Sequence, residues 1–200
     1  MPFCRMAQSW TGDTTPSHTA FRRALDADLS VHVMETGICI SNALAWSPED
    51  SRFYFCDTPQ RQLRVYDYDA PSGAISNLRL FADLGGDPGN PDGGTVDGEG
   101  SLWNAQWDSW RLGRYAPDGT VDRVVMLPVQ KPTSVMFGGA DLRTLFVTSA
   151  IWDLEGQALA RQPLPDRCWR WSPEWPVWPK PDLRDRASSA AMRARIVRLT

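Results

Sequence analysis

The chain has 200 residues, of which 42% are hydrophobic and 22% are charged, and its formal net charge is -3. This balance excludes the basic surface typical of nucleic-acid-binding proteins, and no apolar run approaches the roughly 20 residues that span a bilayer. The first residues lack the apolar centre of a signal peptide, so the sequence predicts a cytoplasmic protein with neither nucleic acid nor membrane as a partner.

In chain order, short strands joined by turns are expected throughout, because 16 prolines and 15 glycines interrupt the sequence often. One pattern, an apolar strand, a turn rich in Pro, Asp or Gly, and a second apolar strand, occurs three times. A second pattern of strand, turn and strand follows it, with weaker copies near both ends. The first pattern covers Ile40–Asp57, Pro91–Ala105 and Pro132–Ser149; the second covers Gln62–Phe81 and Trp110–Leu127, with weaker copies at Phe21–Val33 and from Cys168 onward.

Repetition of about four short strands every 40–50 residues is typical of β-propeller blades. The sequence therefore predicts an all-β fold, a partial propeller of about four blades over residues 1–185. Residues 186–200 are expected to form a separate tail, either a short basic helix or a frayed end.

Three polar residues hold matching places when the repeats are aligned on their second strands. Asn42 lies eleven residues before Phe53, and Ser134 lies eleven before Leu145. Asp92 lies ten residues before Leu102, with one residue fewer in the turn. Because the innermost strands of a propeller surround one axis, we expect these side chains to meet at the mouth of its channel.

Several consecutive motifs carry a resemblance to a known family: ISNALAWSP, PDGGTVDGEGSLW, GRYAPDGTVDR, LPVQKPTSVMFGG and LFVTSA. In this order they resemble the gluconolactonase family of six-bladed propellers, which includes regucalcin (senescence marker protein) and bacterial sugar lactonases. The likeness is dense from residue 38 to residue 150 and weaker on either side. It implies the six-bladed lactonase type of propeller.

The resemblance also implies a divalent cation at the channel mouth, most often calcium, with zinc, magnesium or manganese as alternatives. In the family an N-terminal glutamate, the asparagine of Ile-Ser-Asn and the aspartate of Pro-Asp-Gly hold this ion. The last two correspond to Asn42 and Asp92. The implied function is a metal-dependent lactonase that hydrolyses the ring ester of an aldonolactone, with a metal-polarised carbonyl and Asp92 as the general base.

The chain also departs from the family pattern. The family glutamate and the residues that grip the sugar come from the first two blades, whereas this chain is expected to begin inside the third. Ala43 stands where the family has glycine. We therefore expect a truncated gene product. The alternative function is a catalytically inactive propeller fragment that acts as a binding or structural module, with self-association through its open edges.

Structural roles are expected for most other polar and aromatic residues. Asp97, Glu99 and Asp118 are interpreted as turn formers, and Ser134 as structural. The aromatic pairs Trp46/Tyr54, Trp103/Trp107 and Trp169/Trp171 are interpreted as packing between blades, with carbohydrate stacking as the alternative. The four cysteines are expected to be neutral thiols, and the two histidines predict neither a zinc site nor a Ser-His-Asp triad.

Overall fold

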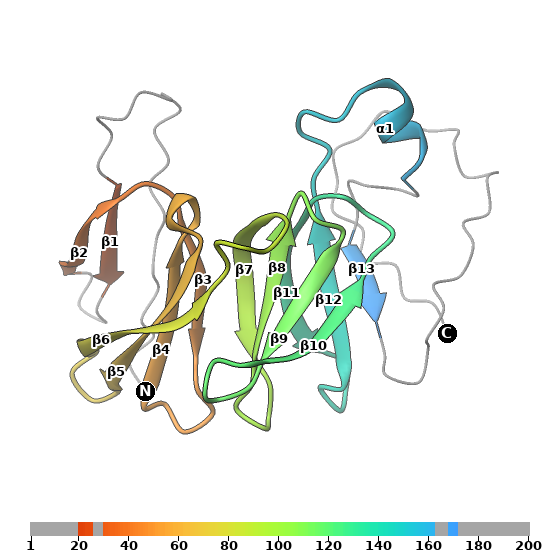
Figure 1. Cartoon of the computed structure of the whole chain (residues 1–200). Helices are drawn as coiled ribbons and strands as arrows, with labels where there is room; N and C mark the ends of the chain where they lie inside the picture. The colour runs from red at the N-terminus through yellow and green to blue at the C-terminus, as the bar shows by residue number, and fades with distance from the viewer. Residues whose placement is uncertain (1–19, 26–29, 163–167, 172–200) are drawn as a thin grey trace.

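A computed structural model describes residues 20–25, 30–162 and 168–171, and antiparallel strands dominate them, as predicted (Figure 1). The strands are β1 (Ala20–Leu25), β2 (Val31–Ile38), β3 (Ser41–Trp46), β4 (Arg52–Asp57), β5 (Gln62–Asp69), β6 (Ala74–Asp83), β7 (Asn90–Val96), β8 (Leu102–Trp107), β9 (Arg111–Tyr115), β10 (Val121–Met126), β11 (Pro132–Gly138), β12 (Thr144–Ser149) and β13 (Cys168–Trp171). The 3-10 turn η1 (Thr58–Gln60) follows β4, and the short helix α1 (Gly156–Ala160) lies between β12 and β13.

Each sheet is a meander in which strands pair with their neighbours in sequence. The sheets are β1-β2, β3-β4-β5-β6, β7-β8-β9-β10 and β11-β12-β13, and they follow one another through the molecule in chain order (Figure 1). The innermost strand β7 packs between β3 and β11. The predicted all-β, partial propeller is therefore confirmed, with three sheets of three or four strands and one two-stranded sheet in the described residues.

The second strands β4 and β8 are buried on both faces, which explains why apolar residues occur on both faces of each. Phe53 and Phe55 of β4 face one cluster, while Tyr54 and Cys56 face the next. In β8, Leu102 packs toward the preceding sheet and Trp103 toward the following one. Successive side chains of a strand point to opposite faces, so one strand joins two inter-sheet cores.

Two apolar cores lie between successive sheets and hold them together. The first joins the sheet of β3–β6 to β8 and β9, and the second joins the sheet of β7–β10 to β11 and β12. Trp103 packs edge-on against Phe137 across the second core, with ring centroids 6.3 Å apart, which confirms its predicted inter-blade role. Trp46 and Tyr54 lie in different clusters, because they project from opposite faces of their sheet.

The outermost strands β6 and β10 leave large apolar side chains on the surface. These are Leu78, Leu80, Val121, Val124 and Met126. Self-association through open edges stays a prediction.

Both weaker copies of the second repeat form strands. β1 and β2 make an antiparallel hairpin, and β13 pairs with β12 as the third strand of its sheet. The predicted tail, residues 186–200, lies outside the described residues, as do the side chains of Trp169 and Trp171. Within the described ranges, no helix has the length and apolar content needed to cross a membrane.

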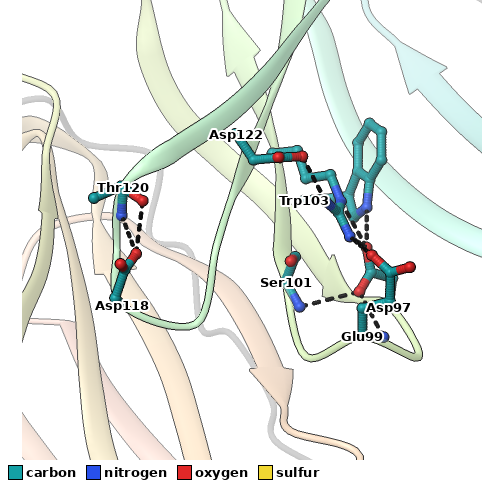
Figure 2. A network of polar contacts seen from close by, with 8 residues as sticks. Asp97, Glu99, Ser101, Trp103, Asp118, Thr120 and Asp122 are labelled. Atoms are coloured by element: carbon teal, nitrogen blue, oxygen red, sulfur yellow. Dashed lines mark hydrogen bonds and ion pairs between the residues drawn. The ribbon is translucent and has the colours of Figure 1, made fainter.

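The turn that follows β7 is held by a network of polar contacts (Figure 2). The Asp97 carboxylate accepts hydrogen bonds from the backbone N–H groups of Glu99 and Ser101, each at 3.0 Å. It also accepts one from Trp103 Nε1 at 2.9 Å and forms an ion pair with Arg114 at 2.7 Å. Asp118 accepts from the backbone N–H of Thr120 at 3.0 Å in the next hairpin. The predicted turn roles of Asp97 and Asp118 are confirmed.

Candidate functional site

Asn42 and Asp92 occupy matching places on neighbouring innermost strands, at the end of the sheets where β3, β7 and β11 begin. We call this end the mouth. Phe53, Leu102 and Leu145, the matching residues of the second strands, pair with Trp46, Val96 and Phe137. Four residues before these partners lie Asn42, Asp92 and Thr133. The predicted equivalence of Asn42 and Asp92 is thus supported by strand register.

The third equivalent place is Thr133 when residues are counted along the first strand, and Ser134 when it is read from the strand pairing. Ser134 lies opposite Thr148, three residues after Leu145, as Asn42 lies opposite Cys56, three residues after Phe53. The turn between Phe137 and Leu145 is one residue longer than the turn between Trp46 and Phe53. Counting eleven residues back from Leu145 therefore ends at Ser134, whereas counting four back from Phe137 ends at Thr133. A register shift between Pro132 and Ser134 separates the two counts.

Backbone contacts bring the three strands close together at this level. A Cβ on Gly93 would lie 2.5 Å from Ser134 Oγ and 2.8 Å from the Thr133 carbonyl oxygen. A Cβ on Gly94 would lie 3.6 Å from Ala43 Cβ. The two residues that follow Asp92 thus face the strands on either side. The approach of Gly93 to β11 leaves no room for a Cβ, whereas a Cβ on Gly94 would make only an ordinary contact with Ala43.

The Thr58 hydroxyl links Asn42 to the strand that carries Asp92. It accepts a hydrogen bond from Asn42 Nδ2 at 2.9 Å and donates one to the Pro91 carbonyl oxygen at 2.8 Å. The amide oxygen of Asn42 accepts no hydrogen bond from the described residues. That oxygen is consequently available as a neutral donor to a ligand.

Asn104 holds the backbone at Asp92 through its side-chain amide. Its Nδ2 donates to the carbonyl oxygens of Asp92 at 2.8 Å and Gly93 at 3.3 Å, and the residue is fully buried. Its Oδ1 has no hydrogen-bond partner within the described part of the chain. Neither Asn104 nor Thr58 was predicted from the sequence. An asparagine inside the buried strand LWNAQW was a signal that could have pointed to Asn104.

The Asp92 carboxyl group is held in a poorly solvated position. Burial raises its pKa from the ordinary value of 3.8 to about 7, and the backbone N–H of Gly93 opposes this shift. Within residues 30–162, no ion pair involves Asp92. A carboxylate in such a place can exchange a proton near neutral pH.

Cys56 lies beneath the mouth and stays a neutral thiol. Burial and then the charge of Asp92 raise its pKa well above the ordinary range. Its Sγ lies 3.7 Å from the Pro91 carbonyl oxygen, to which it donates a weak hydrogen bond. Cys39 is exposed and free, and the side chains of Cys4 and Cys168 lie outside the described residues. The predicted neutral thiol is supported at Cys56.

The donors at the mouth are of the kind that hard cations take, because Asp92 offers carboxylate oxygens and Asn42 an amide oxygen. Among the described residues, no group of three or more His, Cys, Asp or Glu side chains is arranged to hold a metal. The pair therefore fits calcium, magnesium or manganese in donor chemistry, although two residues supply only part of a calcium coordination shell of six to eight oxygens.

An aromatic and cationic cluster lies at the same end of the sheets. Lys131 precedes β11 and is buried; its Nζ donates to the Trp152 carbonyl oxygen at 2.9 Å and lies 5.0 Å from the Trp107 ring centroid. Trp107 pairs with Asn90, two residues before Asp92. Trp107 packs with Trp152, which follows β12 (6.2 Å between centroids). This contact joins two blades, as predicted, although Trp107 lies outside the apolar core that contains Trp103. The Trp152 side chain is 74% exposed.

Comparison with known proteins agrees with this architecture. The model of the SMP-30/Gluconolactonase/LRE-like region matches residues 7–151. The chain belongs to this family. It is 42% identical to pentonolactonase XacC of Haloferax volcanii over 72% of this chain and 50% of the relative, and 41% identical to an L-arabinolactonase of Azospirillum brasilense over 70% and 46%.

A solved structure of a family member agrees in fold. The crystal structure of a calcium-binding regucalcin from Agrobacterium tumefaciens superposes with a TM-score of 0.69 at 27% identity, over 78% of this chain and 57% of that one. The predicted likeness to the gluconolactonase and regucalcin family is confirmed. The chain spans about half the length of the curated relatives it matches.

Proposed function

We propose that this chain carries the catalytic mouth of a metal-dependent sugar lactonase, which hydrolyses the ring ester of an aldonolactone. The observation that supports this best is the matched placement of Asn42 and Asp92 on adjoining innermost strands, with the pKa of Asp92 raised to about 7. Relatives at 41–42% identity are a pentonolactonase and an L-arabinolactonase, so a sugar lactone is the substrate class that we favour.

Asp92 suits the role of general base. Hydrolysis requires a water molecule to add to the ester carbonyl and lose a proton, after which the ring oxygen leaves and is protonated. A carboxylate whose pKa is near 7 is a stronger base than an ordinary aspartate and is still ionised in a useful fraction at neutral pH. It can accept the proton of the attacking water and return it to the leaving oxygen.

Asn42 and Asp92 would hold the cation, with calcium favoured and magnesium, manganese or zinc as alternatives. When bound, a divalent ion stabilises the negative charge that develops on the carbonyl oxygen. Asn42 contributes an uncharged oxygen whose direction is set by Thr58. The exposed indole of Trp152 offers a flat apolar surface near the mouth, on which a sugar ring could stack.

The test is to measure hydrolysis of gluconolactone and pentonolactones by the purified chain, using proton release as the readout. We expect turnover that chelator abolishes and a divalent cation restores. Asp92→Asn should lower kcat by about 10²–10⁴, the usual loss when a general base is removed. Asp118→Asn, a change at an exposed turn, serves as the matched control. Full turnover by metal-loaded Asp92→Asn protein would contradict the proposal.

The alternative is a propeller fragment that binds without turnover. The observation that favours it is the small donor set, since the described residues contain no group of three or more His, Cys, Asp or Glu side chains arranged to hold a metal. It predicts cation binding without hydrolysis of any lactone. Calorimetric titration with calcium beside the hydrolysis assay separates the two functions.

A further inference from the structure

We propose that Thr58 is a positioning residue, which sets the orientation of the Asn42 amide and ties it to the strand that carries Asp92. The inference rests on the proposed role of Asn42 as a cation ligand. Thr58 follows β4 directly, at the start of η1, and no part of the sequence motifs pointed to it.

The backbone of Thr58 is fixed on both sides, so its side chain leaves from a set position. Its N–H donates to the Ile40 carbonyl oxygen at 2.9 Å, and its own carbonyl oxygen accepts from the Arg61 N–H at 3.1 Å. Ile40 lies immediately before β3 and is itself held through its N–H, which donates to the buried Asp57 carboxylate at 2.8 Å. The start of β3 and the start of η1 therefore form one rigid unit.

The chemistry of the partners determines which way each hydrogen bond runs. The Pro91 carbonyl oxygen can only accept, so the single proton of the Thr58 hydroxyl points to it at 2.8 Å. The hydroxyl has then only lone pairs left for Asn42, and must receive an N–H from the amide at 2.9 Å. The amide nitrogen of Asn42 is thereby directed to Thr58 and its oxygen away from it.

This arrangement has a direct consequence for cation binding. An amide that is free to turn by 180° presents its NH₂ group to a cation for part of the time, and that group repels the ion. The Thr58 hydroxyl removes this alternative and, through Pro91, fixes the amide relative to the residue before Asp92. Side chains that orient ligands in this way typically contribute 10- to 100-fold to metal affinity.

Thr58→Val is the decisive variant, because valine has the same shape but lacks the hydroxyl. Thr58→Ser keeps the hydroxyl and is the conservative control, and Thr120→Val removes a hydroxyl at an exposed turn. We expect Thr58→Val to weaken calcium affinity by 10- to 100-fold in calorimetric titration, and Thr58→Ser and Thr120→Val to stay within about threefold of wild type. Wild-type affinity in Thr58→Val protein would overturn the inference.

Two further measurements separate orientation from a general loss of structure. On an Asn42→Ala background, Thr58→Val should cause no further loss of affinity, since nothing remains to be oriented. In the metal-free protein, the side-chain amide NMR signals of Asn42 should move in Thr58→Val and return in Thr58→Ser. An equal further loss on the Asn42→Ala background, or unmoved signals, would overturn the inference. Absence of lactone hydrolysis with Thr58-dependent calcium binding would reject the proposed function and leave this inference standing.

Discussion

Asp92 and Asp97 lie five positions apart at opposite ends of the same strand, yet their surroundings are opposite. The Asp92 carboxyl group has no ion-pair partner among the described residues, and burial raises its pKa to about 7. At Asp97, burial also opposes ionisation, but hydrogen bonds from Trp103, Arg114 and Ser101 outweigh it and hold the pKa below the ordinary value. Burial thus favours the protonated form of Asp92, whereas the donors around Asp97 favour the ionised form that holds a turn.

The difference shows that the pKa of each carboxyl group depends on its hydrogen-bond donors and not on burial alone. The network of Asp97 supplies two backbone N–H groups, an indole N–H and a guanidinium (Figure 2). The polar groups near Asp92 are instead directed at its neighbours' carbonyl oxygens. Four variants test this contrast, in order of decreasing expected effect.

Asp97→Ala should destabilise the protein by about 3 kcal/mol, because it leaves a largely buried Arg114 and several N–H groups without their acceptor. Arg114 keeps its ion pairs with Glu99 and Asp122, which limits the loss. Urea unfolding at pH 7.5 measures it. Asp118→Ala, at the exposed turn of the next hairpin, is the matched control. Equal unfolding midpoints for the two variants would contradict a special role for the Asp97 network.

Asp92→Asn should have the opposite effect on stability. Because the folded-state pKa is raised from 3.8 to about 7, the folded protein holds a proton that the unfolded chain has lost, and stability falls as pH rises from about 4 to about 7. Asparagine removes this fall. In chelator we expect the variant to be more stable than wild type at pH 8, on the order of 2 kcal/mol after allowance for partial exposure, and nearly equal at pH 4.5.

The sign of this pH dependence is the sharpest check on the comparison. Asp97 contributes stability that is present above its unfolded pKa and is lost as pH falls through its lowered folded pKa. In thermal unfolding across pH 3–8, we therefore expect Tm to fall toward acid pH because of Asp97 and to fall again as pH rises toward 7 because of Asp92. If the fall toward pH 7 persists in Asp92→Asn, another group causes it.

Asn104→Leu should destabilise the protein by about 1–2 kcal/mol, because it leaves the carbonyl oxygens of Asp92 and Gly93 without their donor. The loss of the unpartnered Oδ1 partly offsets this effect. Chemical unfolding measures the change in stability. We expect the loss in kcat, expressed as a free energy, to exceed the loss in stability, because the backbone at Asp92 is no longer held. A variant with wild-type kcat would show that this backbone needs no such clamp.

Ala43→Gly should have the smallest effect, a stabilisation of about 0.5 kcal/mol. Ala43 has φ of 53°, a left-handed conformation that strains any residue with a Cβ, and glycine removes this strain. The greater flexibility of glycine in the unfolded chain and the loss of a buried methyl group offset most of the gain. Differential scanning calorimetry resolves the shift in Tm. A clear fall in Tm would show that the packing of the methyl group outweighs the strain.

The repeated strand plan, the all-β partial propeller and the matching places of Asn42 and Asp92 could be predicted from the amino-acid sequence. These follow from local signals: apolar strands of fixed spacing, and turns marked by residues such as Asp97 and Asp118 that bond to their own backbone. Such signals can be recognised in the sequence because each one involves only a few neighbouring residues.

The partners of the mouth residues depended on the tertiary structure. The contacts of Trp107 with Lys131 and Trp152 form because these two residues reach it from the next blade. Thr58 and Asn104 act across strands, through hydrogen bonds to atoms 33 and 12 residues away. A backbone carbonyl can be bonded by any donor that the fold brings within about 3 Å, so no local pattern records these partners.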